Sequence, residues 1–476
     1  MQCKHLFDKE ENNALQSSRL NTHISKCGSI KITKKSNEKN LIVFDVSHPN
    51  GLKNILKRRV FVKYDIDVTR VDDSILNVPA VAGIINIAWA FGIDICIDTL
   101  DRSYLKSLEK IKQVMRHWHP YFPMTTQIHV NKVITNNFSN NGFGLLFTGG
   151  IDSTTSYIKH KDEKINLINV IEEESRRALK SKEVFKMMRR LRKFARNEEV
   201  KINFIKTNLT PSESIQAYFF ERFGLRLWED VSHGMILTGL CAPLTVTNGI
   251  GTVLIASSIT PSYKYSWGSH PRIDNRISWA DIKVRNDKYR MSRFQKMGVI
   301  KAYIEKTGNI PTLRSCDLPL SGNCGKCIKC LRTITGLVLR GIDPNKVGFP
   351  DVTEHTLQLI KTRILNENFF ERKRLVEKAC DIKRRTGKLF FWKDLQEHIP
   401  SKLTHNLIGS RGFFEWFKNV DLDERYKQSK NIRLSILPKL AILHFYNSLP
   451  PMLRKVVKKG MRPIRQTIMQ SVFSAR

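Results

Sequence analysis

The sequence predicts an α/β fold in which a parallel β-sheet is covered by helices on both faces. Between residues 143 and 340, apolar runs of strand length alternate with segments of helical spacing. A Gly-Gly turn of the kind that binds phosphate stands between the first of these strands and the next helix. The chain has 476 residues, of which 41% are hydrophobic, so two or three packed domains are expected.

The N-terminal part is expected to hold a separate domain. Residues 1–40 are polar and predict a loose arm, and residues 41–135 predict an α/β or α+β domain of unknown role. Its expected elements are strands at 41–46, 58–68 and 93–98 and helices at Val78–Phe91 and Ser103–Trp118. The turn-rich segment NNFSNNG, residues 136–142, predicts a boundary.

Residues 143–340 are expected to form the βαβαβ core. The expected strands are Gly144–Phe147, Asn166–Ile171, Lys201–Lys206 and Thr252–Ser257. The expected helices begin near Ser153, cover 184–195 with an apolar stripe, and run over Val231–Val246. The face of the 184–195 helix opposite its apolar stripe is crowded with lysine and arginine.

Residues 341–476 are expected to be mostly helical and basic. After Glu424 the chain has no acidic residue, and its last segment mixes Lys and Arg with apolar residues. Such a tail suits an anionic membrane surface or nucleic acid, and a solvated tail is the alternative.

Charge and cysteine content limit the partners and the compartment. The chain carries 80 Lys and Arg against 44 Asp and Glu, a formal charge of +36. We expect an acidic partner such as tRNA, an anionic membrane surface or a protein, or merely a solvated basic surface. Four of nine cysteines are clustered, which is typical of metal binding in a reducing compartment. The start of the chain shows no secretory signal, so a cytoplasmic location is expected, with peripheral binding to the inner membrane face through the tail.

The loop at residues 148–154 has the features of a phosphate-binding loop. Its glycines allow a sharp turn, the following helix presents free N–H groups, and hydroxyl groups add donors. The residues concerned are Thr148, Gly149, Gly150, Ile151, Asp152, Ser153 and Thr154. Asp152 is expected to act through Mg²⁺ or a loop bond, because a carboxylate repels phosphate. An ordinary capped Gly-Gly turn is the alternative.

The segment LLFTGGIDSTTS resembles the SGGxDS loop of the PP-loop ATP pyrophosphatase superfamily, whose members cut ATP to AMP and pyrophosphate. The resemblance implies a Rossmann-like (HUP-type) parallel sheet, with residues 148–154 at the pyrophosphate end of ATP and Mg²⁺ beside it. Thr148 departs from the usual serine but keeps the hydroxyl group.

Cys316, Cys324, Cys327 and Cys330 predict a metal site. Gaps of two residues let thiolates converge, and four thiolates favour a structural Zn²⁺ ion. An iron–sulfur cluster is the main alternative, although a ferredoxin-type run would need a further cysteine at Ile334. The segment resembles the zinc site of the 7-cyano-7-deazaguanine synthase branch of the superfamily, and this likeness covers residues 143–340.

Those synthases use ATP to activate a carboxylate, join ammonia to it and dehydrate the amide to a nitrile. Where those synthases have a YPDCRPEF-like segment, this chain has SWGSHPRID at residues 266–274. Within it, Trp267 is a candidate for stacking on a base and His270 is a candidate catalytic residue. Ser292, Arg293 and Lys296 lie where the family has a Thr-Lys or Ser-Lys pair opening a helix. Arg293 and Lys296 are therefore candidates for stabilising charge on the α-phosphate, and solvated helix residues are the alternative.

Together these features predict an ATP-dependent enzyme that adenylates a carboxylate on a small-molecule or macromolecular acceptor for attack by a nitrogen nucleophile. A PP-loop tRNA-modifying enzyme and a catalytically inactive nucleotide-binding scaffold or sensor are the alternatives.

Overall fold

The fold is known from a computed structural model that describes residues 28–53, 55–173, 181–223, 225–263, 266–316, 322–366 and 387–428. The chain divides into two compact units. The first comprises residues 1–324 and 346–348, and the second comprises residues 325–345 and 349–476. Most of the basic tail after Glu424 lies outside the described residues.

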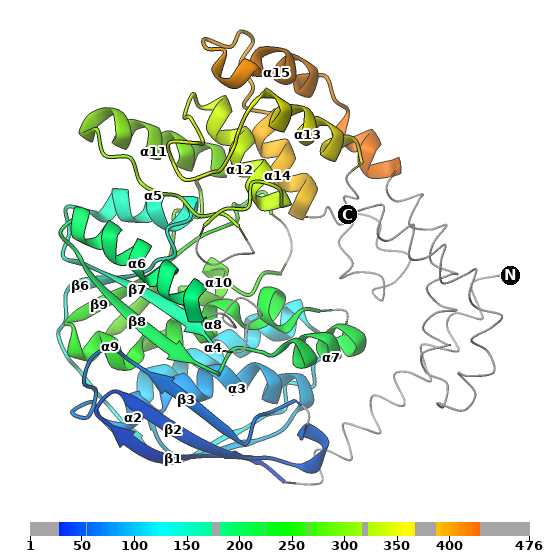
Figure 1. The fold of residues 1–476 in the computed structure, drawn as a ribbon. Helices are drawn as coiled ribbons and strands as arrows, with labels where there is room; N and C mark the ends of the chain where they lie inside the picture. Colours follow the sequence, from blue (N-terminus) through cyan, green and yellow to red (C-terminus); the bar gives the residue numbers. More distant parts are fainter. Residues whose placement is uncertain are drawn as a thin grey trace, which may run out of the picture. The chain divides into compact units, whose positions relative to one another are not determined.

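The first unit is built on one sheet of eleven strands, in the order β10-β11-β9-β6-β7-β8-β3-β2-β1-β4-β5 (Figure 1). The strands are β1 (Ile30–Glu38), β2 (Leu41–Ser47), β3 (Arg59–Lys63), β4 (Ile95–Asp101), β5 (Ile128–Ile134), β6 (Gly142–Leu146), β7 (Ile165–Glu172), β8 (Lys201–Thr207), β9 (Ile250–Ala256), β10 (Ser278–Trp279) and β11 (Ile282–Asp287). Strands β11, β9, β6, β7 and β8 are parallel, which confirms an α/β core with a mostly parallel sheet.

The N-terminal strands extend this sheet instead of forming a sheet of their own. Strand β3 pairs antiparallel with β8, and β1 and β2 follow as a hairpin. Residues 41–135 and 143–340 therefore contribute to one sheet, which continues past the turn-rich segment 136–142. The prediction of a loose arm over residues 1–40 was wrong for Ile30–Glu38, because Ile30 and Ile32 are buried in β1.

Helices cover both faces of the sheet, and the alternation of buried side chains along the strands shows it. Leu146, Ile168 and Ile205 point into a core with α3 (Val78–Phe91), α4 (Arg102–Trp118), α8 (His233–Gly239) and α9 (Ala242–Thr247). Leu145, Leu167 and Phe204 point into a second core with α5 (Ile151–His160) and α6 (Ser181–Asn197). Such alternation is what a sheet buried on both faces requires.

The remaining helices of the first unit are short or lie near the strand ends. They are α2 (Asp73–Leu76), α7 (Glu213–Phe223), α10 (Pro271–Asp274) and α11 (Arg293–Thr307), with a 3-10 turn η1 (Asn50–Leu52) and a π-helix η2 (Leu227–Ser232). The single helix expected over Val231–Val246 is interrupted, because η2, α8 and α9 divide it and Pro243 cannot donate a helical hydrogen bond.

The second unit is helical in the residues described. Its helices are α12 (Ile328–Leu339), α13 (Glu354–Leu365), α14 (Gly387–Gln396) and α15 (Ser410–Lys418), with a 3-10 turn η4 (Leu407–Gly409). Trp392 of α14 and Phe417 of α15 are buried and meet edge to face. In the part of the chain that the structure describes, no helix has the length and apolar character needed to cross a membrane.

Candidate functional site

The loop between β6 and α5 has the geometry expected of an anion-binding turn. The helix begins at Ile151, two residues earlier than expected, so that Asp152 lies in its first turn. Gly149 has a φ of 73°, in the left-handed region that glycine adopts without strain. The Ser153 hydroxyl lies 3.4 Å from both the Thr148 amide and the Gly150 carbonyl. The hydroxyl therefore braces the turn from inside.

Asp152 binds two cationic side chains that come from α11. One carboxylate oxygen lies 2.7 Å from Arg293 Nη2, and the other lies 3.0 Å from Lys296 Nζ. Lys296 is 1% exposed, and its ammonium group also donates to the Ser257 carbonyl at the end of β9. The two helices are joined further by a hydrogen bond from Thr155 Oγ1 to the Lys296 carbonyl, at 3.1 Å. Three sequence-predicted site residues are thus brought together beside the loop.

The charge of Asp152 is maintained by this arrangement. Burial acts to raise the pKa of the carboxyl group, but the charges and hydrogen bonds of Arg293 and Lys296 outweigh it, and the pKa is lowered. Asp152 is therefore an anion held by two cations. This is a different role from the magnesium contact or loop bond expected from the sequence, since both its oxygens bind α11.

Arg190 and Arg314 flank the loop and were missed by the sequence analysis. Arg190 Nη2 donates to the Thr148 carbonyl at 3.1 Å, and the Arg314 amide donates to the Gly149 carbonyl at 2.8 Å. A Cβ atom at Gly149 would lie 2.6 Å from Arg190 Nη1, so the guanidinium group closely approaches the backbone there. Burial and the neighbouring Arg314 charge lower the pKa of Arg190 to about 10.

This pair of arginines makes the loop electropositive. The Arg190 side chain and the Arg314 backbone amide contact neutral carbonyl oxygens of the loop, whereas the α11 cations share the charge of Asp152. A cavity of about 160 Å³, lined by residues that include Gly149, Arg190 and Asn309, adjoins the loop. Two like charges held close together repel one another, and an anion bound between them would remove that repulsion.

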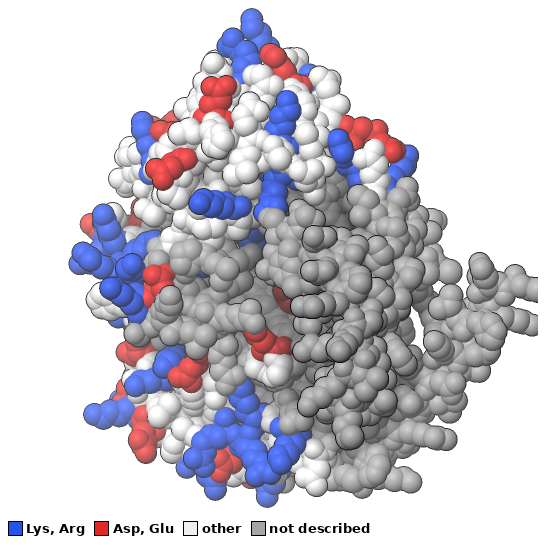
Figure 2. All heavy atoms as spheres, turned by 45° about the vertical axis from the view of Figure 1, so that its right-hand side comes forward, with Lys and Arg blue, Asp and Glu red and all other residues white. Residues whose placement is uncertain are grey.

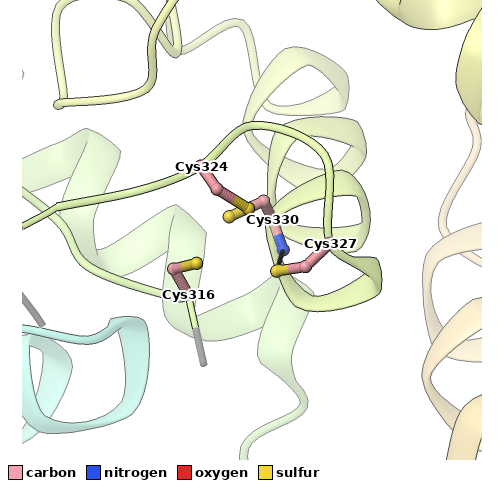
Figure 3. Close-up of side chains that lie close together, drawn as sticks. All are labelled: Cys316, Cys324, Cys327 and Cys330. Carbon is pink, nitrogen blue, oxygen red and sulfur yellow. Dashed lines mark hydrogen bonds between the residues drawn. The ribbon is translucent and has the colours of Figure 1, made fainter. Parts of the chain in front are cut away.

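The four predicted cysteines lie together, as Figure 3 shows. Their sulfur atoms all lie within 4.8 Å of one another. Cys316 and Cys330 are buried, and Cys324 and Cys327 are half-buried. Gly325 has a φ of 70° and allows the turn that brings Cys327, the N-cap of α12, toward the others. The cluster is therefore able to hold a metal ion.

A hydrogen-bonded segment links this cluster to the phosphate loop. Asn323 Oδ1 accepts from the Ser315 amide at 2.8 Å and from the Cys316 amide at 3.3 Å. Its Nδ2 donates at 2.9 Å to the carbonyl groups of Leu313 and Gly348. One asparagine thus positions the backbone on both sides of Arg314, which itself binds Gly149.

His270 lies apart from the Asp152 group in its contacts. Its Nδ1 accepts from the Arg272 amide at 3.0 Å, which makes it the N-cap of α10, and its Nε2 lies 3.3 Å from the Tyr289 hydroxyl. Burial and the nearby Arg272 charge lower its pKa to about 4, so the ring is neutral near pH 7. Trp267, the other candidate of this segment, meets Tyr263 edge to face.

Asp274, at the end of the same segment, is a buried carboxyl group with an unusual environment. One oxygen accepts from Ser269 Oγ at 2.8 Å and from Asn286 Nδ2 at 2.7 Å, while Oδ1 has no hydrogen-bond partner among the described residues. Burial raises its pKa to about 7, and these two hydrogen bonds only partly oppose the shift. Gly234 makes room for it, since a Cβ atom there would lie 2.1 Å from Oδ1.

We expect Asp274→Asn to remove a pH dependence of stability. The folded-state pKa lies above the ordinary value of 3.8, so the folded chain binds an extra proton between about pH 4 and 7 and loses stability as pH rises through that window. Urea unfolding at pH 5 and pH 8 measures it. From pH 5 to pH 8, the free energy of unfolding of the wild type should fall by about 2–3 kcal/mol more than that of the variant. Equal losses in both proteins would show that Asp274 does not titrate there.

Comparisons of the chain with protein-family models, with curated proteins and with solved structures found no match. The features of the chain that bear on function are a strand–loop–helix turn with flanking arginines, an Asp152–Arg293–Lys296 cluster, and a group of four cysteines.

Proposed function

We propose that this chain is an ATP-dependent ligase of the PP-loop type, with a HUP-type sheet, which cleaves ATP to AMP and pyrophosphate. One observation carries the proposal: a glycine loop at the end of β6 lies beside a carboxylate that holds Lys296 and Arg293 in place. A capped turn of purely structural role has no need for four basic side chains around it. Phosphoryl transfer needs such positioned positive charge.

In the proposed reaction, a carboxylate oxygen of the acceptor bonds to the α-phosphorus of ATP while the bond to the pyrophosphate oxygen breaks. The loop amide groups, Arg190 and Arg314 would hold the departing pyrophosphate, with Mg²⁺ carried in on the nucleotide. Lys296 and Arg293 would offset charge at the α-phosphate, and Asp152 would position them. A nitrogen nucleophile then attacks the acyl carbon and AMP leaves with its oxygen.

The cysteine cluster fits a structural Zn²⁺ ion. Tetrahedral Zn–S bonds of about 2.3 Å place sulfur atoms about 3.8 Å apart, so the cluster, already within 4.8 Å, needs only a small contraction. Four thiolates leave no position for substrate, so zinc would hold the segment that contains Arg314 and take no part in the chemistry.

The test is the product formed from ATP. Purified protein should release AMP and pyrophosphate from ATP when a carboxylate acceptor is present. The source of the acceptor is first a whole cell extract and then fractions of that extract. Release of ADP and phosphate would contradict the proposal. Nucleotide binding without any turnover, even with extract, would favour the inactive scaffold considered above.

We expect Arg190→Ala to weaken nucleotide binding with little effect on the chemical step. Because a charged hydrogen bond contributes about 1.5–3 kcal/mol, the KM for ATP should rise about tenfold or more while kcat changes little. Inhibition by added pyrophosphate should weaken by the same factor, and Arg190→Lys should recover part of it. Unchanged pyrophosphate inhibition would place Arg190 in a purely structural role at Thr148.

A further inference from the structure

The outer face of α6 carries a dense group of positive charges. Between Lys182 and Arg196 the chain has seven basic residues and one acidic residue, Glu183. Six of these basic side chains are exposed, namely Lys182, Lys186, Arg189, Arg192, Lys193 and Arg196. At 1.5 Å per residue they extend along about 21 Å of helix. Figure 2 shows one group of Lys and Arg side chains at the height of α6, and others above and below it.

The acidic residues near this face neutralise little of it. Glu183 lies 3.7 Å from Lys186. Glu198, at the end of α6, accepts hydrogen bonds from the hydroxyl groups of Tyr157 and Tyr303, at 2.9 and 2.6 Å. Glu199 is exposed beside it. The face therefore keeps a large net positive charge.

A groove with an apolar floor lies along this face. Ala195, Val200 and Ile202 line it together with Arg189, Arg192 and Arg196, and its volume is about 380 Å³. Phe185 also lines it, and this side chain is 63% exposed. The Arg192 guanidinium group lies over the Phe204 ring, 5.1 Å from its centre, which holds one cation in place. An exposed aromatic ring among arginines is a costly surface unless something covers it.

We propose that the α6 groove binds single-stranded nucleic acid. Phosphates would pair with Arg189, Arg192 and Arg196 while a base stacks on Phe185. A duplex would hide its bases from Phe185, and an anionic membrane offers no ring to stack. The groove thus combines the two contacts that single strands make: a cationic track and an aromatic platform. The inference concerns a surface outside the phosphate loop and does not depend on ATP cleavage.

The experiment measures binding of the full-length protein to fluorescein-labelled RNA and DNA 20-mers of the same sequence by fluorescence anisotropy, without ATP, over a salt series. The variant replaces Arg189, Arg192 and Arg196 by Glu. A control replaces Lys31, Lys110 and Lys132 by Glu, which are exposed residues of β1, α4 and β5, elements that do not line the groove, and which change the net charge equally. Thermal melts verify folding, and an Arg189→Glu, Arg196→Glu double variant avoids the Arg192–Phe204 contact.

We expect the α6 triple variant to bind at least about 100-fold more weakly at low salt, with the slope of log K against log salt reduced by about 2, since each phosphate contact contributes about 0.7. The control should keep most of its affinity and slope. Phe185→Ala should weaken binding about tenfold without changing the slope, and Phe185→Trp should retain it. A preference for RNA over DNA would identify the 2′-hydroxyl as a contact within the same site.

Three results would overturn the inference. The first is equal weakening in the α6 variant and the control, which would indicate general charge attraction. The second is equally tight binding of a duplex of the same sequence through α6. The third is absence of binding to both single strands while phosphatidylserine vesicles bind, which would assign the face to a membrane.

Discussion

Asp152→Asn is expected to abolish release of AMP and pyrophosphate, with a loss of at least about 10²–10³-fold. The substitution keeps the shape of the side chain but removes the charge that holds Arg293 and Lys296. Lys296 is almost fully buried, and an ammonium group left there without its carboxylate would repel its neighbour and move. The measurement is the initial rate of AMP formation, corrected for the folded fraction.

The same substitution should lower stability. Breaking a buried ion pair from one side costs about 3–5 kcal/mol, and a denaturant titration should show a cost of this order at pH 7. Because the folded-state pKa of Asp152 is lowered, its stabilisation is present above the ordinary value and is lost as pH falls through the lower folded value. The variant should therefore lack the wild type's extra sensitivity to acid in that range.

A control separates loss of activity from loss of fold. Asp162→Asn removes a carboxylate just after the same helix, but Asp162 is exposed. The rate of AMP formation and the stability of this variant should therefore stay near those of the wild type. A double variant with Lys296→Met should recover stability, since it removes the stranded cation as well. Full activity in stable Asp152→Asn protein would refute both the proposed role and the proposed function.

Cys330→Ser is expected to lose the bound metal and much of the stability of the segment around it. Its sulfur atom is completely buried, and a serine hydroxyl is a poor replacement for a thiolate ligand. Structural zinc contributes about 10–16 kcal/mol of binding free energy in zinc-finger peptides. Elemental analysis should give one zinc per wild-type chain and almost none in the variant, and the melting temperature should fall clearly.

Cys96→Ser is the matched control, because Cys96 lies in β4, outside the cluster, and its Sγ donates a hydrogen bond to Ser29 Oγ at 3.2 Å. Its zinc content and melting temperature should match the wild type. Iron with visible absorbance in place of zinc would support a cluster cofactor. Equal metal content in both variants would show that the four cysteines do not hold a metal.

Local patterns predicted the core of the fold because they depend on near neighbours. The apolar runs of β6, β7, β8 and β9 and the amphipathic α6 are readable in windows of a few residues. Gly149 was identified as a turn residue for the same reason. Strand β1 was missed because its buried Ile30 and Ile32 alternate with lysines, so that its composition resembles a polar arm.

Contacts between distant segments were beyond such patterns. Arg293 lies 141 residues from the carboxylate it binds, and only the resemblance to a known family suggested it. Nothing in the sequence around Arg190 distinguishes it from the six exposed basic residues beside it on α6. In the structure, however, Arg190 contacts the Thr148 carbonyl of the loop. The burial that raises the pKa of Asp274 likewise depends on Gly234, which lies in another element and leaves room for Oδ1 of Asp274.

The junction between β3 and β8 has a consequence for how the chain folds. Only two residue pairs join these strands, Val62 with Thr207 and Lys63 with Lys206. Side chains strengthen it, since Thr207 donates to the Phe61 carbonyl at 2.7 Å and Asp65 accepts from the Phe204 amide at 2.9 Å. Such bonds form only after both strand groups are in place. The backbone pairing here is short, so the shared core that α3 and α4 form with Leu146, Ile168 and Ile205 must supply most of the cohesion between the hairpin and the parallel strands, and the two strand groups are expected to unfold together.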